Sequence, residues 1–210
     1  FIVLPTFIKR ISYLRHYEKM NMFEIDLNDL SGKILLATPS MNHGIFKDTV
    51  IFLCSHSEDG AMGIIINKPV QALSFSSICK DLKIEDQVSL ELPVLFGGPV
   101  EKNRGVILHS QDYNVEKETL KCTSTLSMTA SFTILSDLAR GLGPANALLA
   151  VGYAGWAPNQ LETELASNCW MFGKLEDKEI LSTDLDQKWS NSLKNSGVEP
   201  SNISSNFGSA

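Results

Sequence analysis

The amino-acid sequence predicts a single domain of the α+β class. The chain has 210 residues, a length that one domain can accommodate. Short apolar runs typical of strands occur both as a closely spaced pair and separated by segments with helical periodicity. This alternation is too irregular for a doubly wound parallel sheet, and no internal repeat or charged linker divides the chain.

Apolar, β-branched runs predict the strands of the sheet. They are residues 34–37, 49–54, 62–66, 94–96, 106–108 and 147–153, with a further strand at 180–181. Asp59 and Gly60 lie between the second and third runs and are typical of a tight turn. We therefore expect those two strands to form an antiparallel hairpin.

Apolar residues at helical spacing predict four helices. The first begins at Ser74, the second is capped by Ser131, the third follows a turn at 155–158, and the fourth ends at Gly197. Their apolar faces carry Phe75, Ile78 and Leu82 in the first; Ile134, Leu135, Leu138 and Leu142 in the second; Leu161 and Leu165 in the third; and Trp189 and Leu193 in the fourth.

The composition is that of an acidic globular protein. Hydrophobic residues make up 43% of the chain and charged residues 20%, so neither disorder nor a fibrous repeat is indicated. The formal net charge is −6, and residues 1–22 are themselves basic, which makes the remainder more acidic still. Because such a surface repels phosphate backbones, direct nucleic-acid binding is disfavoured.

The two ends of the chain are expected to lie outside the folded domain. We interpret residues 1–22 as an N-terminal extension, 23–200 as the domain, and 201–210 as a loosely ordered tail rich in Ser and Asn. The apolar run 1–8 precedes its basic residues, the reverse of a secretory signal, and is too short to span a bilayer. We expect a cytoplasmic protein with no membrane partner.

Several stretches, in their order and spacing, resemble one known family. They are Leu36, Ala37, Pro39, Met41 and Phe46; Gly60, Ala61, Gly63, Asn67 and Pro69; Gly97, Gly98, Pro99 and Val100; Arg104, Gly105, Leu108 and His109; Gly152, Tyr153, Ala154, Gly155, Trp156, Gln160, Leu161, Glu162 and Glu164; and Trp170. Together they look like the YqgE/AlgH family of small bacterial proteins, and the combination is more specific than any single motif.

The resemblance implies a barrel-like sheet flanked by helices and a cytoplasmic location in a bacterium. It implies no reaction, ligand or cofactor, although the family carries the label of a transcriptional regulator. Two positions depart from the family pattern, since His43 stands where an acidic residue is usual and Asn159 where glycine is usual. An acidic role at position 43 is therefore not expected in this chain.

Glu162 and Glu164 invite comparison with the paired carboxylates of acid–base enzymes. Residues two apart on a helix diverge by about 200°, so these side chains are expected to point apart rather than converge. Asn159 followed three residues later by Glu162 also matches a capping box, which gives Glu162 a structural role. Glu164 stays open to either a structural or a catalytic role.

Phosphate and metal sites are not indicated. The glycine segments 97–99 and 152–160 match neither the dinucleotide-binding fingerprint nor the P-loop, and acidic residues would oppose an anion at the second. Their glycines are expected at positive φ or at close backbone contacts. Cys54 and His56 would share a strand face under regular alternation, but no pair has the spacing of a zinc site. The four cysteines are expected to be buried, reduced thiols.

The remaining polar and aromatic residues of the family pattern define a hypothetical binding surface. It comprises Asn67, Gly97, Gly98, Pro99, Arg104, Tyr153, Trp156, Gln160 and Glu164. The first hypothesis is a non-enzymatic binding or regulatory module that engages a protein or small molecule there. Because no basic reading helix is present, direct control of DNA rests on the family label alone.

The alternative hypothesis is an enzyme of the hydrolase or transferase type. It would use a polar pocket around His109 and Glu164, with Arg104 as electrostatic support. No nucleophile stands in a recognisable setting for this chemistry. The sequence therefore favours the binding module.

Overall fold

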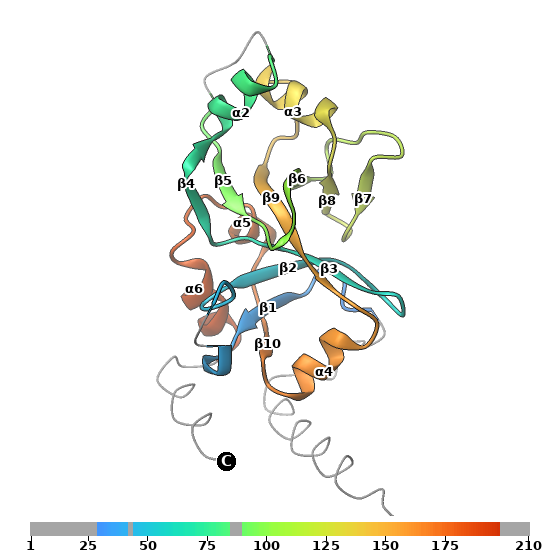
Figure 1. Ribbon diagram of the computed structural model, residues 1–210, viewed down its shortest axis with the longest axis vertical. Helices are drawn as coiled ribbons and strands as arrows, with labels where there is room; N and C mark the ends of the chain where they lie inside the picture. The colour runs from blue at the N-terminus through green and yellow to red at the C-terminus, as the bar shows by residue number, and fades with distance from the viewer. Residues whose placement is uncertain (1–28, 42–43, 85–89, 198–210) are drawn as a thin grey trace, which may run out of the picture.

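The computed structural model describes residues 29–41, 44–84 and 90–197 (Figure 1). The expected N-terminal extension at 1–22, the expected tail at 201–210 and His43 lie outside these residues. The strands are β1 (Ile34–Ala37), β2 (Val50–Ser57), β3 (Gly60–Ile65), β4 (Pro69–Ser74), β5 (Pro93–Phe96), β6 (Val100–Ser110), β7 (Thr119–Lys121), β8 (Leu126–Thr129), β9 (Ala147–Trp156) and β10 (Trp170–Gly173). The helices are η2 (Pro39–Met41, 3-10), α2 (Phe75–Asp81), α3 (Phe132–Ala139), α4 (Gln160–Ala166), α5 (Asp177–Ile180) and α6 (Lys188–Asn195).

The strands form one curled sheet, which confirms the predicted α+β domain with a mixed, barrel-like sheet flanked by helices. The order of the main path is β10-β1-β2-β3-β9-β6-β8-β7, with β5 and then β4 branching from β9. All pairs are antiparallel except β5 with β9.

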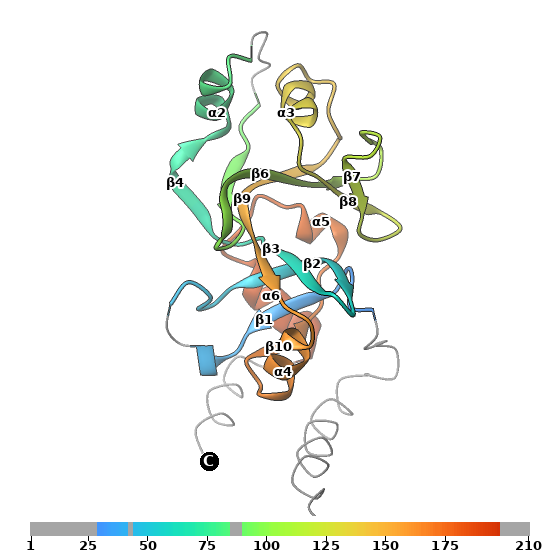
Figure 2. The ribbon, with the colours of Figure 1, turned by 45° about the vertical axis from the view of Figure 1, so that its right-hand side comes forward.

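Strand β9 joins the two halves of the sheet, as Figures 1 and 2 show. Its first half lies between β5 and β6, and its last three residues pair with β3, from Gly63 opposite Ala154 to Ala61 opposite Trp156. The predicted strand therefore continues through Gly155 and Trp156, where the sequence had suggested a turn. Pairing with β3 supplies the backbone hydrogen bonds that keep this segment extended.

Apolar side chains from the β1–β2–β3 part of the sheet enter two separate cores. One face packs with α5 and α6 through residues such as Ile180 and Leu193, and the other packs with α4 through Leu161 and Leu165. Both faces are covered, which explains why β1 and the first half of β2 are continuously apolar rather than alternating. A third core lies under α2 and α3 at the other end of β9.

The predicted hairpin of β2 and β3 is confirmed, with Ser57 opposite Gly60. Its register shifts between Leu53 and Ser55, so the ladder contains a bulge at Cys54. Cys54 enters the core beneath α5 and α6, whereas His56 bonds to a residue of α4 on the other side. The expectation that Cys54 and His56 share a face was wrong because the bulge breaks the alternation on which it depended.

The predicted helix starts are largely confirmed. Ser74 caps α2 and forms a reciprocal capping box with Ser77. Ser131 is the N-cap residue of α3, although its hydroxyl makes no capping bond. Leu142 was assigned to the apolar face of α3, but the helix has ended by then and the side chain is 68% exposed.

Two further local predictions were wrong or incomplete. The strand expected at 180–181 is the end of helix α5, which Glu176 and Glu179 start with a capping box. Strand β10, from Trp170, was not predicted, although its pairing with β1 closes that edge of the sheet. The expected end of the last helix at Gly197 is confirmed by its φ of 73° just after α6.

None of the helices in the described part of the chain combines the length and apolar character needed to cross a membrane.

Candidate functional site

Three glycines allow two backbone segments to cross at the middle of β9. A Cβ atom at Gly97 would lie 2.2 Å from the Gly152 carbonyl oxygen, and one at Gly98 would lie 2.1 Å from the Tyr153 carbonyl carbon. Gly152 has φ 73°, and a Cβ there would lie 2.5 Å from the Gly98 oxygen. Only glycine fits this crossing, which agrees with the close backbone approach expected from the sequence.

Beside this crossing, β6 carries a large bulge. Val100 pairs with Tyr153 and Gly105 with Val151, so residues 101–104 of β6 face Gly152 alone. These four residues, Glu101, Lys102, Asn103 and Arg104, are all exposed. Bulges of this kind redirect side chains and are frequent near functional sites.

The side chains of the bulge are partly organised by one another. Arg104 donates a hydrogen bond of 3.0 Å to the Glu101 carboxylate, and the Tyr153 hydroxyl approaches the same carboxylate at 3.5 Å. Glu101 has φ 45°, a left-handed conformation that is strained for a glutamate. We call Glu101, Lys102, Asn103, Arg104 and Tyr153 the β6 platform.

At the C-terminal end of β9, Glu164 is an acceptor for two tryptophans. One carboxylate oxygen accepts the indole N–H of Trp156 at 2.8 Å and that of Trp170 at 2.7 Å. The other oxygen accepts a hydrogen bond from Gln160 at 2.8 Å. Both indoles are buried and their rings meet edge to face. Both carboxylate oxygens of Glu164 are therefore used to hold this part of the fold together. Gln160, a residue of the hypothetical binding surface, belongs to this same network.

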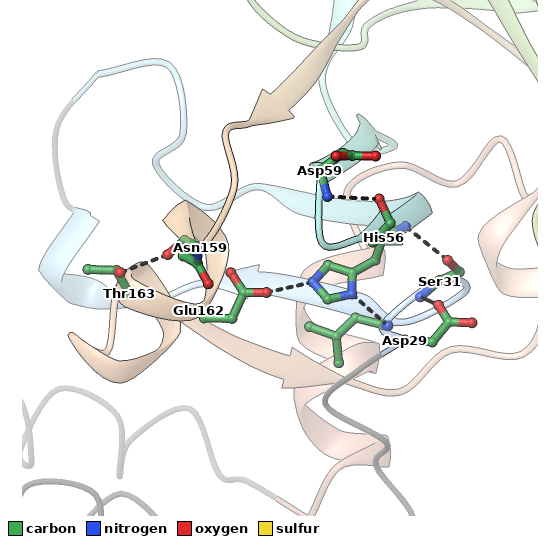
Figure 3. Close-up of polar contacts among 9 residues, drawn as sticks. Asp29, Ser31, His56, Asp59, Asn159, Glu162 and Thr163 are labelled. Atoms are coloured by element: carbon green, nitrogen blue, oxygen red, sulfur yellow. Dashed lines mark hydrogen bonds and ion pairs between the residues drawn. The ribbon is translucent and has the colours of Figure 1, made fainter.

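Glu162 bonds to His56 rather than capping helix α4. Its carboxylate lies 2.8 Å from His56 Nε2, and the ring of His56 is only 4% exposed (Figure 3). The capping box expected from Asn159 and Glu162 was wrong, because Asn159 adopts φ 61° and makes no capping bond. Asn and Gly are the residues that tolerate this left-handed conformation best.

The hydrogen bonds of His56 leave neither ring nitrogen free for acid–base chemistry. Nδ1 accepts the backbone N–H of Leu30 at 3.3 Å, so Nε2 carries the proton that it donates to Glu162. Ser31 accepts the backbone N–H of His56, and Asp29 accepts that of Ser31 (Figure 3). His56 therefore ties the segment before β1 to helix α4.

At the other end of β9, His109 is fully buried in a chain of hydrogen bonds. Nδ1 donates to the Ser110 carbonyl at 2.7 Å, which makes Nε2 the acceptor for the Thr129 hydroxyl at 2.9 Å. Thr129 in turn bonds to Thr119 at 2.7 Å, and Thr119 accepts the N–H of Val115. Burial lowers the pKa of His109, so the neutral ring that this chain requires is favoured.

Asn67 is also engaged within the fold. Its side-chain oxygen accepts the N–H of Val50, and its side-chain nitrogen donates to the carbonyl of Asp48, each at 2.8 Å. The amide therefore holds the start of β2 against the end of β3.

The three residues proposed for an enzymatic pocket do not meet. Arg104 bonds to Glu101, His109 to Ser110 and Thr129, and Glu164 to two tryptophans and Gln160. His109 lies opposite Ala147 and Glu164 bonds to Trp156, nine residues further along β9. At the rise of an extended strand this separation is roughly 30 Å.

Potential metal ligands are likewise not grouped. Among residues 29–41, 44–84 and 90–197, no three His, Cys, Asp or Glu side chains cluster as a metal site would require. The cysteines of the chain are all free thiols.

The β6 platform was only partly anticipated from the sequence. Arg104 and Tyr153 were named, whereas Glu101, Lys102 and Asn103 were not. The sequence did indicate the bulge, because four consecutive polar residues followed by Gly105 interrupt an otherwise apolar strand pattern. Glycine within a strand pattern often marks a bulge.

Comparison with known proteins gives one consistent family. A family model described as AlgH-like (DUF179) matches residues 34–201. A UPF0301 protein of Cereibacter sphaeroides strain ATCC 17029 is 42% identical over 183 residues, which cover 87% of this chain and 100% of the relative. A UPF0301 protein of Paracoccus denitrificans is 40% identical over 186 residues, 87% of this chain and 98% of that protein.

Solved structures show the same fold. The solution structure of the AlgH protein from Pseudomonas aeruginosa superimposes with a TM-score of 0.72 at 31% identity, covering 90% of this chain and 100% of that one. A crystal structure of protein DIP2367 from Corynebacterium diphtheriae gives a TM-score of 0.66 at 18% identity, covering 84% and 91%.

Proposed function

Because the chain belongs to the AlgH-like family, we propose that it is a non-enzymatic binding or regulatory module whose β6 platform docks a protein partner. The proposal follows from a contrast among the polar side chains. His56, His109, Glu162 and Glu164, which could do chemistry, are bonded within the fold. The four platform side chains of the bulge are exposed, and Tyr153 beside them is partly exposed.

The conformation of Glu101 is the observation that carries the proposal. A left-handed glutamate costs roughly 1–2 kcal/mol relative to its preferred conformations. Strain of this kind is retained where surrounding structure holds it, and it clusters at functional sites. Here the glycine crossing beneath the bulge holds the backbone of 101–104 in place.

The chemistry of the platform suits a protein surface. Arginine and tyrosine are enriched at the residues that dominate protein–protein binding, and Arg104 and Tyr153 stand together there through Glu101. A partner with both acidic and basic side chains would match the mixed charge of Glu101, Lys102 and Arg104. The chain has a net charge of −6, which disfavours direct binding to DNA. Any effect on transcription would therefore act through the protein partner.

The experiment compares partners recovered by wild type and by matched variants. Affinity purification from bacterial cytosol, quantified by mass spectrometry, would use Arg104→Glu and Tyr153→Ala as platform variants. The control is Arg140→Glu, which makes the same charge reversal at an exposed position after α3. We expect a partner near equal stoichiometry that both platform variants lose and the control retains.

Equal recovery of every protein by all four forms would contradict the proposal. Circular dichroism spectra should be superimposable, because none of the substituted side chains enters a core. Salt-sensitive binding of the purified protein to a defined DNA duplex, abolished by the platform variants, would replace the protein partner with DNA.

A further inference from the structure

The β6 platform contains a carboxylate that is bound by its own neighbours. The two oxygens of Glu101 face donors from two strands, since Arg104 Nη1 of β6 donates to one at 3.0 Å and the Tyr153 hydroxyl of β9 approaches the other at 3.5 Å. A guanidinium and a phenol that converge on one carboxylate are suitable donors for binding such a group. Glu101 therefore shows which chemical group these two side chains can hold.

The internal ion pair is weakly held. The side chains of Arg104 and Glu101 are 54% and 47% exposed and lie three residues apart in the same bulge. Exposed pairs of this kind are nearly balanced by the hydration of the separated charges. A carboxylate from another molecule can therefore take the place of Glu101 at little cost.

The donors stay available when the Glu101 side chain turns away. The Tyr153 ring lies beside Gly155, where its Cε2 would be 3.6 Å from an added Cβ atom, and the glycine crossing holds the backbone of 101–104. Lys102 lies next to the pair, and within the described part of the chain its side chain makes no hydrogen bond or ion pair. Release of Glu101 would thus leave two positive charges, on Lys102 and Arg104, to face an acidic group.

We propose that Glu101 is an internal competitor at the β6 platform, and that an acidic side chain of the protein partner replaces its carboxylate at Arg104 and Tyr153. Lys102 supplies a second positive charge to the same acidic segment, and the released Glu101 is free to pair with a basic group of the partner. This inference rests on the proposed function of the β6 platform. It adds the chemistry that the partner presents and a restraint on its binding.

The experiment titrates a tetraglutamate peptide, blocked at both ends, into isotope-labelled protein and follows the side-chain N–H signal of Arg104 by NMR. Glu101→Ala removes the competitor and keeps a Cβ atom at the left-handed position. We expect the half-saturating peptide concentration to fall by about two- to five-fold in this variant, the range that an exposed ion pair allows. Arg104→Ala should abolish the saturable shifts of the Tyr153 ring.

Glu58→Ala is the matched control for charge. Glu58 is exposed in the turn between β2 and β3, and its loss changes the net charge by the same amount as the loss of Glu101. This control should bind the peptide as wild type does. Equal gains in the two variants would mean that the peptide senses net charge alone, which would overturn the proposal. Unchanged or weaker binding by Glu101→Ala, or no shift at Arg104 in any form, would overturn it as well.

Recovery of partners from bacterial cytosol separates this inference from the proposed function. A partner that Arg104→Glu loses should be recovered in greater amount by Glu101→Ala than by wild type. If that partner is recovered equally by both, the β6 platform docks a protein without replacing Glu101, and only this inference is wrong. If Arg104→Glu retains every protein that wild type recovers, the docking function is wrong and this inference fails with it.

Discussion

Along β9, polar side chains at the two ends bond to partners inside the protein, whereas those beside its middle face solvent. At one end His109 is closed within a chain of hydroxyl groups, and at the other Glu164 accepts two indole N–H groups. At the middle, Glu101 and Arg104 stand on an exposed bulge above Gly152. The same strand thus supports two structural networks and one available surface.

The difference shows why residue type alone is a poor guide to function in this molecule. Histidine and glutamate are the usual acids and bases of enzymes, yet here their hydrogen-bonding capacity is used by the fold. The exposed bulge depends instead on backbone geometry, since the glycine crossing lets four residues of β6 arch over one residue of β9. Substituting Gly152 should therefore lower the free energy of unfolding more than removing a residue of either network.

The largest effect is expected from Gly152→Ala. Its Cβ would lie 2.5 Å from the Gly98 oxygen and 2.8 Å from the Val100 oxygen, and these are backbone atoms that cannot move aside cheaply. We expect the free energy of unfolding to fall by about 3 kcal/mol or more, combining the overpacking and the left-handed conformation. Urea denaturation followed by circular dichroism would measure it.

Gly197→Ala is a matched control for this substitution. Gly197 has the same φ of 73°, but among the described residues no atom lies within 4 Å of a Cβ placed there. It should lose only the conformational part, about 1 kcal/mol. Equal losses in the two variants would show that crowding at the crossing does not constrain the middle of β9.

A smaller effect is expected from Glu164→Ala at the C-terminal end of β9. The substitution leaves the indole N–H groups of Trp156 and Trp170 buried without their acceptor, at a cost of about 2 kcal/mol in the free energy of unfolding. Glu101→Ala removes an exposed carboxylate and should change stability by less than about 0.5 kcal/mol. Similar losses of unfolding free energy in the two variants would show that Glu164 matters no more to the fold than the exposed Glu101.

The elements whose apolar runs are long could be predicted from the sequence. The β2–β3 hairpin and the starts of α2 and α3 follow from local patterns, so the predictions there are confirmed, although the Ser131 hydroxyl makes no capping bond. The sequence placed the end of the preceding helix before Cys169 but did not identify β10 as a strand, since its four residues gain strand character only by pairing with β1. The α5 segment was misassigned because the buried Ile180 fits a strand or a helix equally well.

The polar networks depended on information that local sequence does not contain. Glu162 follows Asn159 at capping-box spacing, but its partner His56 lies 106 residues away in the chain. The left-handed φ of Asn159 that prevents capping is likewise invisible in a residue pattern. The glycine crossing was easier to predict from the sequence, because Gly97, Gly98 and Gly152 each suggested a close backbone approach.

The last effect concerns His109 and appears as a dependence of stability on pH. Burial lowers the pKa of His109 in the folded protein, so below about pH 6.5, the ordinary value, the unfolded chain binds more protons. The stabilisation is therefore complete above that pH and is lost as the pH falls. One such group contributes at most about 1.4 kcal/mol per pH unit to the free energy of unfolding.

His109→Gln tests this dependence, since an amide does not titrate. Unfolding free energies measured by urea denaturation between pH 7.5 and pH 5 should decline less steeply in the variant than in wild type, whatever its stability at neutral pH. Equal slopes would mean that His109 accepts a proton in the folded protein as readily as in the unfolded chain. The hydroxyl chain through Thr129 and Thr119 would then rearrange to accept a charged ring.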